Sequence, residues 1–182
     1  MKRIMYMMKR ILLFLALAQM TLLNAQTTNH ESDFGNLFLE GSVVRGLKSD
    51  GISPVGAQIG IGYNVTSRFY PMITAEYLSG HYNESGMKTF YDSGNIGFGL
   101  GYTFLRGKND YLSFLQNADL RVNVGTTIGH VDWKYNYYGV ELKMGFRKTN
   151  TPVIGVGYRY MNSRTEGLSN YKGVFVTLGF KI

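Results

Sequence analysis

The stretch YKGVFVTLGFKI (171–182) is apolar at every second position. The apolar residues are Val174, Val176, Leu178, Phe180 and Ile182. A period of two indicates a β-strand with one apolar face, because successive side chains of a strand point to opposite sides. An apolar strand with a free edge invites aggregation. The pattern therefore predicts a sheet in which this strand has partners on both sides.

Seven further segments share this alternation, and turn residues separate them. They are 37–46, 54–64, 68–79, 95–106, 118–129, 137–147 and 153–161. The total of eight is even, and each segment has about the length that a tilted strand needs to cross a membrane. We therefore predict an all-β protein, an eight-stranded antiparallel up-and-down transmembrane β-barrel. Residues 171–182 would close it by pairing with 37–46.

The N-terminal region has the pattern of a secretory signal peptide. Lys9 and Arg10 precede the short apolar run ILLFLALA, and the small residue Ala25 follows. We expect a signal peptide at 1–25, a flexible polar lead at 26–36 and the barrel at 37–182. Met8 is an alternative start to Met1, and an uncleaved N-terminal anchor helix is the alternative to a signal peptide.

The charge of the chain does not indicate nucleic-acid binding. The net charge is +7, but four of the 19 basic residues (Lys2, Arg3, Lys9 and Arg10) precede the apolar run. The remaining basic residues alternate with acidic ones, whereas nucleic-acid binding requires a basic patch. The chain has no Cys, which excludes a disulfide framework.

Glycine decides which face of the strands is expected inside. In 95–106, Gly97, Gly99 and Gly101 lie opposite Ile96 and Phe98. Glycine on a solvated face weakens a strand without improving solubility, whereas the interior of a narrow barrel is crowded. We therefore expect the glycine face inside, where small residues leave room for large ones from neighbouring strands.

Charged residues share the glycine face. The predicted interior set is Glu40, Glu76, Arg121, Glu141, Lys143, Arg147 and Arg159. Because buried charges require partners, we predict an ion-pair network that plugs the interior and leaves no wide pore. The alternative is that these charges form the solvated outer face of a soluble barrel.

Aromatic residues and connections also fit a membrane barrel. Aromatic residues lie near strand ends on the apolar face, as at membrane interfaces: Tyr63, Phe69, Tyr77, Phe104, Tyr138, Phe146, Tyr160 and Phe180.

Tight connections are expected at 65–67 and 148–152, and a long polar loop at 80–94. The connection 107–117 is expected to hold a helical turn or to extend its flanking strands. We expect Pro71 to cause a bulge, because proline removes a ladder hydrogen bond.

The signal peptide, the eight amphipathic segments and the closing GFKI together resemble the eight-stranded outer-membrane β-barrel family of the outer-membrane protein A and X type. The resemblance covers 37–182. It implies that the last strand carries the insertion signal read by the barrel-assembly machinery. The matching positions are Val176, Leu178, Phe180 and Ile182, and Ile182 departs from the family's usual aromatic ending.

Candidate catalytic residues are few. Some barrels of this size modify lipid A with a Ser/His/acid set near the outer rim, and Ser79, His81 and His130 are the weak candidates here, with Glu84 or Asp132 as the acid. Such a site needs its groups within hydrogen-bond reach. No enzyme signature is present, so we expect no catalytic site, no cofactor and no metal site.

The sequence therefore predicts a monomeric outer-membrane protein of a Gram-negative bacterium with a structural or surface-interaction role. Its expected partners are outer-membrane lipid, the barrel-assembly machinery and an extracellular ligand or host surface bound by loops 80–94 and 129–136. A lipid A-modifying enzyme, a narrow channel and a soluble periplasmic ligand-binding barrel are the alternatives.

Overall fold

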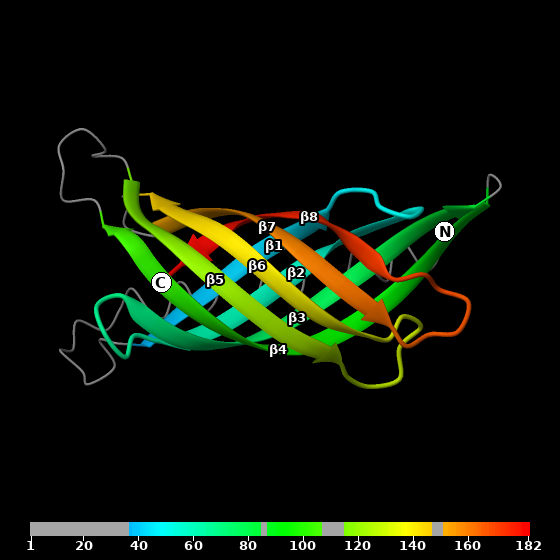
Figure 1. The fold of residues 1–182 in the computed structure, drawn as a ribbon, viewed down its shortest axis with the longest axis horizontal. Helices are drawn as coiled ribbons and strands as arrows, with labels where there is room; N and C mark the ends of the chain where they lie inside the picture. Colours follow the sequence, from blue (N-terminus) through cyan, green and yellow to red (C-terminus); the bar gives the residue numbers. More distant parts are fainter. Residues whose placement is uncertain (1–36, 85–86, 107–114, 147–150) are drawn as a thin grey trace. The chain divides into compact units, whose positions relative to one another are not determined.

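The described part of the chain is a single closed β-barrel (Figure 1). The computed structural model describes residues 37–84, 87–106, 115–146 and 151–182. Among these residues, no helix is both long enough and apolar enough to cross a membrane. The strands are β1 (Leu37–Gly46), β2 (Ile52–Tyr63), β3 (Phe69–Glu84), β4 (Met87–Arg106), β5 (Leu115–Thr127), β6 (Tyr135–Phe146), β7 (Thr151–Ser163) and β8 (Tyr171–Lys181).

Each strand pairs antiparallel with its neighbours in sequence, and β8 pairs with β1 to close the barrel. The predicted eight-stranded antiparallel barrel and the predicted pairing of the last segment with 37–46 are therefore confirmed. Ile182 continues this pairing beyond β8, because its amide donates to the Leu39 carbonyl at 2.9 Å and its own carbonyl accepts from the Leu39 amide at 2.8 Å. Closure leaves the apolar last strand without a free edge.

The strands are strongly staggered around the barrel. Starting from Glu40 on β1 and following paired residues through β2 to β7 leads to Tyr171 on β8. Glu40 itself pairs directly with Lys181. The two routes therefore end ten positions apart on β8, at Tyr171 and at Lys181. Such a stagger requires strands that tilt against the barrel axis, as Figure 1 shows.

The barrel has two distinct ends. The terminal end is where β1 begins and β8 ends, and the hairpin end is where β1 joins β2, β3 joins β4, β5 joins β6 and β7 joins β8. At the hairpin end, Asp50 and Gly51 have φ angles of 47° and 82°. Positive φ at both central residues is the geometry of a two-residue hairpin turn, which favours Asp-Gly.

The prediction of a long polar loop at 80–94 is wrong. The ladder between β3 and β4 continues without a break to the pair Glu84 and Met87. Figure 1 shows the two strands reaching beyond their neighbours at the hairpin end. Polar residues and glycine are frequent in 80–94, and they conceal the period of two in the sequence.

The prediction of a bulge at Pro71 is also wrong. Pro71 pairs in register with Leu100 on β4. The ladder between β2 and β3 ends at the pair Gly62 and Met72, so Pro71 lies one residue beyond the end of that ladder. The register shifts lie elsewhere, between Thr103 and Leu105 on β4 and between Leu115 and Asn117 on β5.

The two remaining predicted connections are only partly described. Residues 115–117 of the predicted connection 107–117 belong to β5, so the flanking strand is extended there, which was one of the two predicted outcomes. The rest of that connection, and most of the predicted tight turn at 148–152, lie outside the described residues.

Candidate functional site

The outer wall of the barrel carries a continuous aliphatic band. Every strand contributes to it, and the side chains are exposed between more buried neighbours. The band comprises Val43, Ile61, Ile73, Ile96, Leu100, Leu120, Val122, Val124, Val140, Leu142, Ile154, Val156 and Leu178. The apolar face is therefore outside, as the glycine pattern predicted.

Exposed aromatic residues flank this band toward both ends of the strands. Tyr63, Phe69, Tyr102, Phe104 and Phe180 lie toward the terminal end, and Phe90, Tyr138, Tyr158 and Tyr160 lie toward the hairpin end. Of the aromatic residues predicted on this face, Tyr77 and Phe146 are only half-buried rather than exposed. An aliphatic band between two aromatic belts is the surface pattern of a membrane-spanning barrel.

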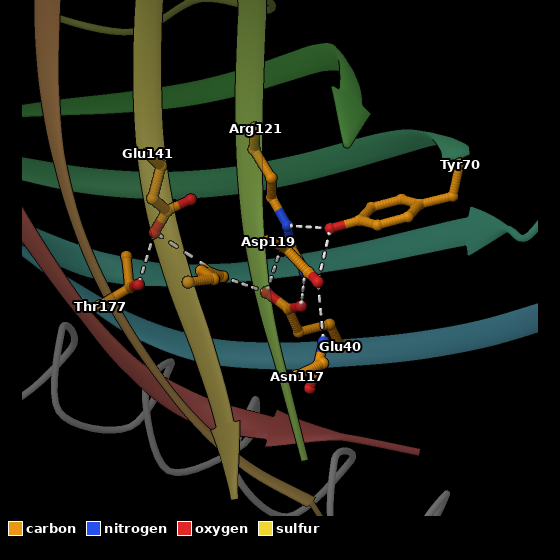
Figure 2. Close-up of polar contacts among 8 residues, drawn as sticks. Glu40, Tyr70, Asn117, Asp119, Arg121, Glu141 and Thr177 are labelled. Carbon is orange, nitrogen blue, oxygen red and sulfur yellow. Dashed lines mark hydrogen bonds and ion pairs between the residues drawn. The ribbon is translucent and has the colours of Figure 1, made fainter. Parts of the chain in front are cut away.

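The interior toward the terminal end is centred on the Glu40 carboxylate. Arg121 donates to both of its oxygens, at 3.0 Å and 2.7 Å, and the Lys143 ammonium forms a second ion pair with it. The three side chains come from β1, β5 and β6 and are at most 3% exposed. Figure 2 shows Arg121 and Glu40 within the group of contacts. Two cations thus satisfy one buried carboxylate, as a buried charge requires.

Asp119 and Tyr70 extend this network. The Tyr70 hydroxyl donates to Asp119 at 2.9 Å and accepts from Arg121 Nε at 2.6 Å, and Asn117 donates to Asp119 at 2.8 Å (Figure 2). Sequence reasoning missed Asp119 as an interior charge. Asp119 lies two residues before Arg121 on β5, so it shares the inward face of that strand, and this spacing would have predicted its position.

Glu141 and Lys181 complete the terminal half. The Thr177 hydroxyl donates to Glu141 at 2.6 Å, and Lys143 Nζ lies 3.8 Å from the same carboxylate. Lys181 Nζ lies 3.9 Å from the centre of the Phe38 ring. An ammonium over an aromatic face is attracted by the electron-rich ring.

A second ion pair lies nearer the hairpin end. Arg159 Nη1 donates to the two Glu76 oxygens at 2.7 Å and 2.8 Å. Its guanidinium carbon lies 4.7 Å from the Tyr137 ring centre and 4.5 Å from the Phe175 ring centre. The pair is therefore both charge-compensated and enclosed between aromatic faces.

The interior charges balance within the described residues. Four carboxylates (Glu40, Glu76, Asp119 and Glu141) face four cations (Arg121, Lys143, Arg159 and Lys181). The seventh predicted interior residue, Arg147, lies outside the described residues. A balanced set leaves no surplus charge that would favour one sign of permeating ion.

Apolar and aromatic side chains fill the hairpin end of the interior. The cluster comprises Val44, Ile52, Leu78, Trp133, Tyr135, Tyr137, Met161, Tyr171 and Phe175, all at most 3% exposed. Trp133 comes from the connection between β5 and β6, and its amide donates to the Asp92 carbonyl at 3.0 Å. This connection thus places the single Trp of the chain over the mouth of the barrel.

Interior glycines accommodate the large side chains, as predicted. A Cβ atom at Gly62 would overlap the Phe38 ring, one at Gly101 the Tyr70 ring, and one at Gly125 the Tyr137 ring. In each case the glycine provides the space that a large residue on another strand fills.

The candidate catalytic residues make no catalytic arrangement in the described part of the chain. Ser79 Oγ and His81 Nε2 are buried and have no hydrogen-bond partner, and the His81 ring stacks on Phe90 at 5.0 Å. His130 is exposed in the connection between β5 and β6. Among the described residues, no group of three or more His, Asp or Glu side chains is placed to hold a metal ion.

The positions of the predicted insertion signal lie on the outer wall of β8 or just beyond it. Leu178, Phe180 and Ile182 are exposed, and Val176 is half-buried. They therefore form one outward-facing row beside β1.

No protein-family model matches the sequence, and no curated protein sequence is significantly similar to it.

Proposed function

We propose that the protein is a small outer-membrane β-barrel that crosses the membrane with its eight strands. The observation that supports this most directly is the aliphatic band on all eight strands, set against an interior of paired charges. Contiguous exposed apolar patches on soluble proteins rarely exceed a few hundred Å², whereas a band around the whole barrel is what a bilayer covers. The aromatic belts would lie at the two membrane interfaces.

The proposed location also rests on the signal-peptide pattern at 1–25. In this arrangement the terminal end faces the periplasm and the hairpin end faces the exterior, because the extended β3–β4 hairpin and the connections 128–134 and 164–170 lie at the hairpin end. The barrel-assembly machinery would read the outward row of Val176, Leu178, Phe180 and Ile182.

The proposed role is structural or in surface interaction. The interior charges of the described residues pair with one another, so contacts with an extracellular ligand or host surface would involve the hairpin end. The strongest candidate surfaces are the outer part of the β3–β4 hairpin and the connection 128–134. Phe90, 46% exposed, lies on this hairpin beyond the aliphatic band.

Fractionation with gel mobility tests this proposal. A closed membrane barrel remains folded in mild detergent at room temperature, so we expect the protein in the outer-membrane fraction and a change of its gel mobility on boiling. The Glu40→Gln variant should unfold at a lower temperature than the unmodified protein, and its gel mobility should therefore change at a lower temperature. Recovery of the protein as a soluble periplasmic monomer would contradict the proposal.

A further inference from the structure

Three exposed basic side chains gather where β1 meets β8 at the hairpin end. Arg45 on β1 pairs with Val176 on β8, and the Leu47 amide donates to the Val174 carbonyl at 2.9 Å. Lys48 follows Leu47 directly, and Lys172 lies two residues before Val174 on β8. Closure of the barrel thus brings together basic residues from the two ends of its sequence. We call Arg45, Lys48 and Lys172 the seam patch.

The seam patch differs from the interior charges because it has no carboxylate partner. Among the described residues, none of its three side chains forms an ion pair. Asp50 is the nearest acidic residue in sequence, two positions after Lys48 in the β1–β2 turn, and it is exposed. The patch therefore keeps a net positive charge that a partner outside the barrel can neutralise.

The seam patch lies at the border of the apolar wall. Lys172 pairs with Tyr160 on β7, and Val174 pairs with Tyr158, so the patch adjoins the aromatic belt of the hairpin end. Arg45 points outward, because Val44 and Gly46 beside it are buried. Long basic side chains beside interfacial tyrosines reach the level of lipid headgroups, where phosphate groups lie.

We propose that the seam patch binds the phosphate of an anionic membrane lipid whose acyl chains lie against β1 and β8. Charge complementarity selects this occupant, since the patch is cationic, unpaired and continuous with the apolar wall that the acyl chains would cover. This inference rests on the proposed membrane location. It goes further by naming the lipid chemistry and the place on the barrel.

Energy transfer from Trp133 provides a local test. Trp133 is the only Trp of the chain and belongs to the same buried cluster as Tyr171, the neighbour of Lys172. The full protein is placed in phosphatidylcholine nanodiscs that contain a few per cent of phosphatidylglycerol carrying a fluorescent acceptor. Nanodiscs with the same acceptor on phosphatidylcholine provide the reference. One basic side chain raises the local concentration of anionic lipid about fivefold. We therefore expect clearly greater energy transfer to labelled phosphatidylglycerol than to labelled phosphatidylcholine.

The variant Arg45→Gln/Lys48→Gln/Lys172→Gln should remove this difference. The variant Arg68→Gln/Arg106→Gln/Lys134→Gln loses the same number of exposed charges elsewhere and should retain it. Equal transfer to both lipids in the unmodified protein, or an unchanged preference in the first variant, would overturn the inference. So would loss of the preference on adding inorganic phosphate at constant ionic strength, because the patch would then bind free phosphate. Both variants should keep the heat-dependent gel shift, so failure here is distinguishable from failure of the proposed membrane location.

Discussion

At the scale of single residues, the Glu40 carboxylate holds two buried cations in place. The substitution Glu40→Gln keeps the size of the side chain but leaves Arg121 and Lys143 without their shared counter-charge. Removing one partner of a buried pair typically costs about 3–5 kcal/mol. We expect the free energy of unfolding, measured by urea titration of the lipid-refolded protein, to fall by about 3 kcal/mol.

A matched substitution separates this effect from a general loss of negative charge. Glu166 is exposed in the connection between β7 and β8, so Glu166→Gln should change the unfolding free energy by less than about 0.5 kcal/mol. The double variant Glu40→Gln/Lys143→Met should recover part of the lost unfolding free energy, because it removes one of the two cations that Glu40 pairs with. Equal stability of Glu40→Gln and the unmodified protein would show that the network contributes nothing.

At this scale, the sequence predicts which residues face inward but not which ones meet. Parity along each strand places Glu40, Glu76, Arg121, Lys143 and Arg159 inside, and all five are buried in the structure. Their pairing depends on the barrel stagger, since Glu40 and Lys143 are 103 residues apart. No local pattern encodes that stagger. For the same reason, the sequence does not predict the contact of Tyr70 with both Asp119 and Arg121.

At the scale of the strand, glycine sets how closely a large neighbour can approach. Phe38 on β1 pairs with Gly62 on β2, and a Cβ atom there would overlap the Phe38 ring. Overpacking of this kind typically costs about 1–3 kcal/mol. We expect Gly62→Ala to lower the unfolding free energy by about 2 kcal/mol and the double variant Gly62→Ala/Phe38→Leu to lose less than the sum of the two single variants.

Gly41 on β1 provides the control for the effect of alanine on a strand. No atom lies within 4 Å of a Cβ atom at this position. Gly41→Ala should therefore be neutral or slightly stabilising, because alanine loses less conformational freedom than glycine on folding. A similar loss in Gly41→Ala and Gly62→Ala would mean that the backbone, rather than the Phe38 ring, sets the cost.

Strand lengths are where the sequence was least informative. The bounds of β1 follow from alternation alone, because one of its faces is apolar and the other faces the core. The outer halves of β3 and β4 have no such contrast, and residues 80–94 have the composition of a loop. Their pairing is specified by continuation of the ladder from the barrel, which is a property of two strands together.

At the scale of the whole molecule, the aliphatic band distinguishes a membrane barrel from a soluble one. Leu142 on β6 is 40% exposed and lies within the band. An arginine on the lipid face near the middle of a bilayer costs about 2–4 kcal/mol, so Leu142→Arg should lower the unfolding free energy in lipid vesicles by about that amount. Val65→Arg, in the β2–β3 turn beyond the band, should cost less than about 1 kcal/mol. Equal effects of the two substitutions would indicate that no bilayer surrounds β6.

The filling of the barrel determines whether it conducts ions. The Glu40 network occupies the terminal half, the Glu76–Arg159 pair lies nearer the hairpin end, and the aromatic cluster around Trp133 and Tyr135 fills that end. An ion crossing the barrel would have to separate these pairs, and a buried charge without a partner is strongly unfavourable. We therefore expect no discrete conductance steps in planar-bilayer recordings of the purified protein, with insertion verified by the heat-dependent gel shift of the same sample. Reproducible steps that vanish in a Glu40→Gln variant would instead place an ion path through the network and favour a narrow channel.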